Sequence, residues 1–262
     1  MKVEILNPDV VRDLYKNHGV FACVCYDTPE KYAERVGQSC QDNGHFSGSR
    51  CEYIKFRISD IDRGTAEQCL RHEIGVDVPF EFQDNYSFTD YMELIKDVPV
   101  DHIVKNMASF RYIDKTGFTW ETPGLIRNYP HIMDYYDETM EKLNRRRTRL
   151  KCMLTEVGED PKKINEAINF VLPRATKSEF VIGFTPEALI QFMHKRLCVR
   201  AQEHIHELAM QMRAEVNRLN PRFAKELQAQ CQYLLWCPEG ERCCGRKPTR
   251  EKFVEKLENG MW

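Results

Sequence analysis

Alternating apolar and polar positions predict strands at two places near the start of the chain. The segment Lys2–Leu6 alternates, and Cys51–Ile58 alternates with aromatic and β-branched residues that pack well on a pleated surface. The apolar run Phe21–Tyr26 fits a buried strand or the end of a helix, because periodicity alone does not separate the two. These segments predict a mainly antiparallel sheet.

Helical spacing appears between and after these strands. Residues Lys31–Gln41 have helical spacing that ends at Asn43–Gly44, which is a plausible C-cap. Asp62 is expected to cap the next helix, because its side chain can accept an unpaired amide of the first turn. The apolar face of that helix is formed by Ala66, Cys69, Leu70 and Ile74.

Longer helices are predicted in the second half of the chain. His131–Gly158 forms a long helix whose RRRTR run is interpreted as a solvated face. Glu159–Pro173 forms a short helix that ends at its proline. A mostly buried apolar repeat predicts one long helix from Thr185 to Leu219. Thr185 is its expected N-cap, and Pro186 lies in its first turn.

Residues 77–105 differ from their surroundings, because they are rich in aromatic and acidic side chains with turn signals at Pro79 and Pro99. This segment is predicted to be an insertion. The fold class is α+β, a helix-rich domain around a mainly antiparallel sheet. The predicted organisation is one main domain, residues 1–220, which contains the insertion and is followed by a cysteine-rich C-terminal extension, residues 221–262.

Composition narrows the class of protein. The 262 residues are 42% hydrophobic and 30% charged, which allows a real core and excludes a disordered chain. The formal charge of −2 gives no global basic field, so nucleic acid is not an expected partner. The N-terminus has no secretory pattern and no window of about 18 apolar residues occurs, so we expect a cytoplasmic protein with no membrane association.

The eleven cysteines are expected to be mostly reduced thiols, because their number is odd, the chain is long and no secretory signal is visible. The last four are clustered, and two interpretations remain open for them. They could bind a structural zinc ion, which prefers tetrahedral sulfur ligands, or belong to a reduced, cysteine-rich tail; the absence of C-x2-C pairs favours the tail. The cluster consists of Cys231, Cys237, Cys243 and Cys244.

Several sequence motifs with known chemistry are absent. No glycine-rich dinucleotide fingerprint, P-loop, H-E-x-x-H or G-x-S-x-G pattern occurs. His204 and His206 are two positions apart and point to different faces of a helix, so we expect no metal site there.

Polar residues recur instead in short blocks. In Gln68-x-x-Arg71 the amide and the guanidinium share one helical face, while Ser109-x-Arg111 adds a hydroxyl and Arg196 a further guanidinium. Any one of these arginines alone is more simply explained by a surface salt bridge. Together they suit a phosphate and a planar base, because arginine binds phosphate bidentately and glutamine can pair with an imide. The blocks are residues 44–47, 68–73, 106–112 and 192–202.

These blocks resemble the flavin-dependent thymidylate synthases, the ThyX family, whose signature is R-H-R-x-x-S-x-N-E-x-S-x-R-Y. Residues 71–76, RHEIGV, resemble its first half, and residues 106–112, NMASFRY, its second half. GHFS, FRISDIDRGTAEQ, FVLP and FMHKRLCVRAQ match further family patterns in the same order, from about Cys23 to Ala209.

The resemblance implies reductive methylation of dUMP at C5 to dTMP in a homotetramer with active sites shared between subunits. It implies FAD, NADPH and methylenetetrahydrofolate, and no enzyme nucleophile is needed. The catalytic residues would be Arg71, Ser109 and Arg196, and the nucleotide would bind to Gln68, Arg71, Ser109, Arg111 and Arg196. The residues implied at the cofactor are His45, Ser47, His72, Glu73, Asn106, Thr185, Gln191 and Arg200.

The chain departs from the family pattern at several positions. The third signature residue is Glu73 in place of arginine, and the signature glutamate is Met107, which hydrogen-bonds only weakly. Asn169 replaces an arginine before V-L-P, and loss of such a phosphate contact costs about 1.5 to 3 kcal/mol. Arg50, Arg200 or the insertion could compensate. These departures leave open a family member acting on another pyrimidine nucleotide, or a non-catalytic nucleotide-binding protein. In addition, this chain has Arg50-Cys51 where the family pattern has a glutamate-histidine pair, and Thr185 and Gln191 where it has asparagines.

Overall fold

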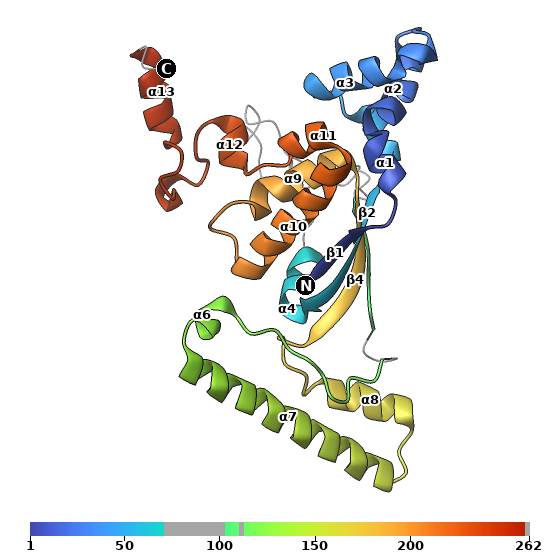
Figure 1. Ribbon diagram of the computed structural model, residues 1–262, viewed down its shortest axis with the longest axis vertical. Coiled ribbons are helices and arrows are strands. Elements are labelled where there is room, and N and C mark those ends of the chain that lie inside the picture. Colours follow the sequence, from blue (N-terminus) through green and yellow to red (C-terminus); the bar gives the residue numbers. More distant parts are fainter. Residues whose placement is uncertain (71–102, 110–112, 260–262) are drawn as a thin grey trace, which may run out of the picture.

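The computed structural model describes residues 1–70, 103–109 and 113–259 (Figure 1). A four-stranded sheet with the strand order β1-β2-β4-β3 lies at its centre, and every pair of neighbouring strands is antiparallel. The predicted α+β class with a mainly antiparallel sheet is confirmed. The strands are β1 (Lys2–Ile5), β2 (Ile54–Asp62), β3 (Ile103–Met107) and β4 (Lys177–Phe184).

Helices surround this sheet unevenly (Figure 1). Helices α4, α9 and α10 contact the strands, α2 and α3 form a pair at one end, and α7 with α8 forms an arm at the opposite end. The N-terminal helices are α1 (Pro8–Arg12), α2 (Leu14–Cys25), α3 (Ala33–Asp42) and α4 (Arg63–Leu70), with the 3-10 turns η1 (Glu30–Tyr32) and η2 (Ser47–Cys51). The later ones are α6 (Gly124–Arg127), α7 (Pro130–Glu156), α8 (Pro161–Asn169), α9 (Pro186–Arg196), α10 (Glu203–Leu219), α11 (Pro221–Glu226), α12 (Gln230–Leu234) and α13 (Arg250–Glu258), with the 3-10 turn η4 (Gly240–Arg242).

The core lies on one face of the sheet. Strand β2 alternates, so that Phe56 and its neighbours two positions away are buried while Arg57 is exposed. Phe184 of β4 packs between Phe56 and Phe192 of α9, with ring centroids 6.4 Å and 5.1 Å away. On the other face, the guanidinium of Arg57 lies 3.4 Å from the carboxylate of Glu179. The sheet therefore has one apolar and one polar face.

The turn from β2 into α4 positions the start of α4. The register of β2 against β4 shifts between Ile58 and Ile61, where Asp60 takes a positive φ of 55°. Asp62 then accepts a 2.8 Å hydrogen bond from the amide of Thr65 through its Oδ1. The predicted cap of this helix is confirmed, and it fixes where Gln68 lies on α4.

The single helix predicted from Thr185 to Leu219 is wrong, because the structure has two helices there. The Thr185 side chain caps α9 as predicted, accepting from the amide of Ala188 at 3.3 Å. The helix stops at Arg196, and Gln202 has the extended backbone of an N-cap before α10. Helix α9 packs against β4 and η2, whereas α10 packs against β1, α4 and α11. One straight helix could not make both sets of contacts, so packing overrides the continuous apolar pattern.

Two glycines allow α2 and α3 to approach closely. A Cβ at Gly19 would lie 1.6 Å from the carbonyl oxygen of Ala33, and one at Gly37 would lie 1.8 Å from that of Tyr15. Neither position can hold a larger residue without moving backbone. The close pair supports η2, which contacts α2 and α9.

Helix α7 and strand β3 each depart from a sequence prediction. Within RRRTR, Arg147 is buried with 1% of its surface exposed, so the solvated-face interpretation is wrong for that residue and holds for Arg145, Arg146 and Arg149. Strand β3 begins at Ile103 and pairs with β4, inside the segment predicted as an insertion. No helix in the described ranges is both long and apolar enough to cross a membrane.

Candidate functional site

The predicted site residues lie around three cavities and at one junction of elements. Outside the described residues are Arg71, His72, Glu73 and Arg111, and the side chain of Ser47 is not described. The described members are Gln68, Ser109 and Arg196 from the nucleotide set, and His45, Asn106, Thr185, Gln191 and Arg200 from the cofactor set.

A first cavity of about 570 Å³ lies between α4, the end of β3 and the end of α8; we call it the Ser109 cavity. Ser109 follows β3 directly and is exposed, so its hydroxyl can donate and accept hydrogen bonds. Met107 and Asn169, two positions at which the chain departs from the family pattern, also line this cavity, together with the almost fully exposed Phe170. The structure thus brings the NMASFRY and FVLP blocks together.

A carboxylate is held between two arginines at the wall of the Ser109 cavity. The Oε1 atom of Glu67 lies 3.1 Å from the Nε of Arg63, and its Oε2 atom lies 3.3 Å from a terminal nitrogen of Arg174. All three residues line the cavity, and Arg174 is largely exposed. Glu166 of α8 lines the cavity as well, so its described lining has two basic and two acidic groups. Partly exposed ion pairs of this kind add little stability.

Arg147 of α7 lies directly behind Asn169. Its Nε donates to the carbonyl of Ile168 and a terminal nitrogen donates to Oδ1 of Asn169, both at 3.3 Å. Burial lowers the pKa of this guanidinium, and its Nη1 atom is buried with no hydrogen-bond partner among the described residues. A guanidinium is therefore present next to the position where the family pattern has one, but it comes from another helix.

A second cavity of about 370 Å³ adjoins the first through Arg174, which lines both. Here the side-chain amide of Gln68 donates to the side-chain carbonyl of Gln202, so the second and fourth polar blocks meet. The Nδ1 atom of His204 lies 3.1 Å from Oδ2 of Asp62. That pair joins α10 to the cap of α4.

Basic groups surround the C-terminal end of α4. The Nζ atom of Lys105, on β3, donates to the carbonyl of Leu70 at 2.6 Å, and Asn106 beside it is exposed. Arg196 acts electrostatically on the neighbouring Cys69, yet burial dominates and raises the pKa of the Cys69 thiol to about 12. A thiol with that pKa is not a nucleophile at neutral pH.

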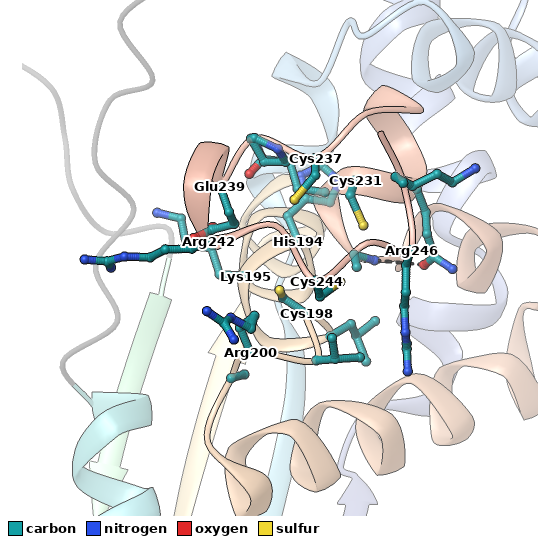
Figure 2. A pocket seen from close by; sticks show the side chains of 18 of the residues that line it. His194, Lys195, Cys198, Arg200, Cys231, Cys237, Glu239, Arg242, Cys244 and Arg246 are labelled. Carbon is teal, nitrogen blue, oxygen red and sulfur yellow. Dashed lines mark hydrogen bonds between the residues drawn. The ribbon is translucent and has the colours of Figure 1, made fainter. Parts of the chain in front are cut away.

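The third cavity, of about 590 Å³, lies between the end of α9 and the chain after residue 228 (Figure 2). Arg196 and Arg200 both line it. The Nε atom of Arg196 is buried and has no hydrogen-bond partner among the described residues. Within the described part of one chain, Arg196 and Ser109 therefore do not share a cavity, although both were predicted at the nucleotide.

Three of the predicted cofactor residues, His45, Thr185 and Gln191, belong to η2, α9 or the residues next to them, and these two elements contact each other. Arg50 makes two hydrogen bonds to Glu187, 2.8 Å from Nε to Oε2 and 3.3 Å from Nη2 to Oε1, which join the two elements. His45 is exposed before η2, and Gln191 is half-buried on α9. Thr185 is fully buried and uses its hydroxyl as the cap of α9. Arg50, named above as a possible compensating cation, is thus paired within the chain.

Sequence reasoning missed several residues that line these cavities or pack next to the candidate site residues. Arg174 follows the FVLP block and could have been noticed from that position, and Glu67 lies four residues after Arg63, the spacing of a helical ion pair. Nothing in RRRTR distinguishes Arg147 from its neighbours. Glu187 becomes informative only when η2 and α9 are seen in contact.

Metal binding finds no geometric support in the described ranges. No group of three or more histidine, cysteine, aspartate or glutamate side chains there is arranged to hold a metal ion. Cys243 instead takes part in local hydrogen bonds, donating to the carbonyl of Lys247 and accepting from the amide of Gly245, both at 3.3 Å. The zinc interpretation of the cysteine cluster gains nothing from this arrangement.

The described groups can bind and orient an anionic, planar ligand. Guanidinium and amide donors are available at the cavities. The chemistry that such donors support is the stabilisation of negative charge on a bound molecule.

Comparison with known proteins identifies a family that the chain matches over most of its length. The family model described as "Thymidylate synthase complementing protein" matches residues 16–222. The chain is 31% identical over 216 residues to the flavin-dependent thymidylate synthase of Nitratidesulfovibrio vulgaris, covering 82% of this chain and 77% of that protein. It is 37% identical over 221 residues to the flavin-dependent thymidylate synthase of Thermococcus onnurineus, covering 81% of this chain and 76% of that protein. The flavin-dependent thymidylate synthase of Clostridium tetani is 26% identical over 235 residues, covering 87% of this chain and 83% of that protein.

Proposed function

Because the chain belongs to the thymidylate synthase complementing protein family, we propose that it is a flavin-dependent thymidylate synthase. It would methylate dUMP reductively at C5 to give dTMP, with methylenetetrahydrofolate as carbon donor and NADPH as reductant. The match over residues 16–222, which contains every polar block described above, carries this proposal. The relatives' names do not favour the alternatives of another pyrimidine nucleotide or a non-catalytic binding protein.

The nucleotide would bind near the C-terminal end of α4. The bond between Gln68 and Gln202 uses one donor and one acceptor, so the remaining amide atoms can pair with the imide edge of uracil. The unpartnered Nε of Arg196 would meet negative charge on the base or the phosphate. Ser109 would add its exposed hydroxyl. Fixed donors of this kind stabilise charge that develops on the uracil ring.

The hydrogen-bond donors and acceptors among the described cofactor residues are of the kinds that bind a flavin. The imidazole of His45 and the amide of Gln191 can pair with ring or phosphate atoms, and Arg200 is an exposed guanidinium with no ion pair among the described residues. When bound, FAD supplies the hydride for the methylation. Thr185 would act by fixing the start of α9, and so the position of Gln191, rather than by touching the cofactor.

The reaction would need no covalent attachment to the enzyme. Cys69, a cysteine near Gln68, is kept protonated at neutral pH by burial. The chain's own contribution would be to hold the reactants in contact and to exclude water around them.

A homotetramer with shared active sites would explain two features. Ser109 and Arg196 line separate cavities of one chain, so a second subunit could bring them to one nucleotide. Apolar side chains are also exposed around the arm, which favours its burial against another subunit. They include Leu125 at 72%, Tyr135 at 70% and Phe170 at 90% exposure.

The proposed organisation keeps residues 1–220 as the catalytic domain, which the family match nearly spans. Residues 77–105 would be an insertion, although the sheet already begins at Ile103. Residues 221–262 would be a cysteine-rich C-terminal extension. The protein would be located in the cytoplasm.

The cofactor half of the proposal can be tested by absorbance. Purified protein is expected to carry FAD or to bind added FAD, and titrated dUMP should perturb the flavin spectrum because base and flavin must be in contact for the hydride to transfer. Buffer that contains dUMP but no FAD is the blank, and UMP is the control nucleotide. A chain that takes up no flavin under any of these conditions would be outside the proposed enzyme class.

A further inference from the structure

The largest of the three cavities discussed above is built partly by the chain beyond the family match. One wall comes from the end of α9 and the loop after it, and the other comes from residues 229–247. Its volume of about 590 Å³ is in the range of cavities that hold nucleotide-sized ligands. Figure 2 shows the segment around η4 passing over the end of α9.

The charge of this cavity is strongly one-sided. Glu239 is the single acidic residue among those that line it. Six basic residues line it, namely Lys195, Arg196, Arg200, Arg242, Arg246 and Lys247. No ion pair is recorded for any of these six in the described ranges, whereas most other arginines there, such as Arg50 and Arg222, are paired with a carboxylate. Like charges gathered around one cavity repel each other, so the arrangement favours a bound anion.

The cations lie on two opposite sides of the cavity. In Figure 2, Lys195, Arg200 and Arg242 lie on the left of the cavity and Arg246 on the right, with the labelled cysteine sulfur atoms between them. Arginine forks pair bidentately with phosphate oxygens, and the cavity also has apolar lining from residues such as Leu197 and Pro238.

We propose that this cavity binds a phosphorylated, nucleotide-sized ligand, with Arg242 and Arg246 of the C-terminal extension as donors from opposite sides of the cavity. The ligand could be the substrate nucleotide, reached through Arg196, or a separate phosphorylated molecule such as the reductant. The phosphate site stands whether or not the chain methylates dUMP, and only the naming of its ligand rests on the proposed function.

Calorimetry with inorganic pyrophosphate tests the site directly. The variant Arg242→Ala/Arg246→Ala is expected to bind pyrophosphate at least about tenfold more weakly than the natural chain, because each charge-assisted hydrogen bond is worth roughly tenfold or more. Arg35→Ala/Arg149→Ala is the matched control, since it removes the same charge from exposed positions of α3 and α7. Its affinity for pyrophosphate should stay unchanged.

Thiol alkylation gives a second readout that does not depend on the variant. Cys244 is exposed at this cavity, whereas Cys25 and Cys152 are exposed elsewhere. Pyrophosphate is expected to slow the reaction of iodoacetamide with Cys244 and to leave Cys25 and Cys152 unaffected.

The same variants identify the ligand. A loss of dUMP affinity in Arg242→Ala/Arg246→Ala would assign the cavity to the substrate phosphate, and a loss of NADPH affinity with dUMP binding unchanged would assign it to the reductant. Pyrophosphate that fails to bind the natural chain, or binds both double variants equally, would overturn the phosphate site. Failure of dTMP formation would not affect these measurements.

Discussion

Replacing Arg196 with alanine is expected to weaken dUMP binding about 10- to 100-fold, the range for losing a charge-assisted hydrogen bond. The Nε atom of Arg196 is buried without a partner among the described residues, beside Cys69 at the end of α4. A buried guanidinium donor without a partner is retained at a cost, which a bound anion or uracil oxygen would offset. Calorimetric titration of dUMP into the FAD-loaded protein measures the change.

Two further variants make this result specific. Arg196→Lys keeps the charge but loses the planar fork, so it should bind dUMP with intermediate affinity. Arg146→Ala removes an exposed arginine from α7 and should bind dUMP like the natural chain. Equal dUMP affinity for Arg196→Ala and Arg146→Ala would remove Arg196 from the nucleotide site.

Replacing Arg147 with alanine is expected to lower the free energy of unfolding by about 2 to 4 kcal/mol, as for other large buried side chains cut back to alanine. The side chain is 1% exposed and donates to Ile168 and Asn169 across the α7–α8 contact. Loss of this side chain leaves a cavity, and the carbonyl of Ile168 and Oδ1 of Asn169 each lose a hydrogen-bond donor. Urea denaturation measures the difference.

The neighbouring residue provides the control. Arg146→Ala should change the free energy of unfolding by no more than about 0.5 kcal/mol, because Arg146 is exposed. Arg147→Met, which fills most of the volume without a charge, should fall between the two alanine variants, since it also removes the cost of burying the guanidinium. The account of Arg147 would be contradicted by equal unfolding free energies for Arg147→Ala and Arg146→Ala.

The parts of the fold that follow from local rules could be predicted from the sequence. The cap at Asp62, the cap at Thr185 and the alternation of β2 depend on neighbouring residues alone, and all three are present. The break between α9 and α10 could not be predicted, because it depends on which strands and helices each half contacts. Strand β4 was missed for a similar reason, since its last three residues are all buried and do not alternate.

The candidate site was predicted in part. Family patterns led to Gln68, Ser109 and Arg196, and the structure places Gln68 against Gln202 and Ser109 in a cavity beside Asn169. Arg147 was not found, because its contact with Asn169 exists only after α7 and α8 pack together. The pairing of Arg174 with Glu67 likewise requires the segment after α8 to lie against α4. Long-range contacts of this kind leave no periodic signal in the sequence.

Formation of dTMP from dUMP tests the central claim most directly. Purified protein would be incubated with FAD, NADPH, methylenetetrahydrofolate and dUMP, and the nucleotides would be separated and quantified. The account predicts that dTMP appears, that omission of FAD from flavin-free protein or of the folate abolishes it, and that Arg196→Ala forms far less. Protein that binds both FAD and dUMP yet forms no dTMP with the complete mixture would contradict it.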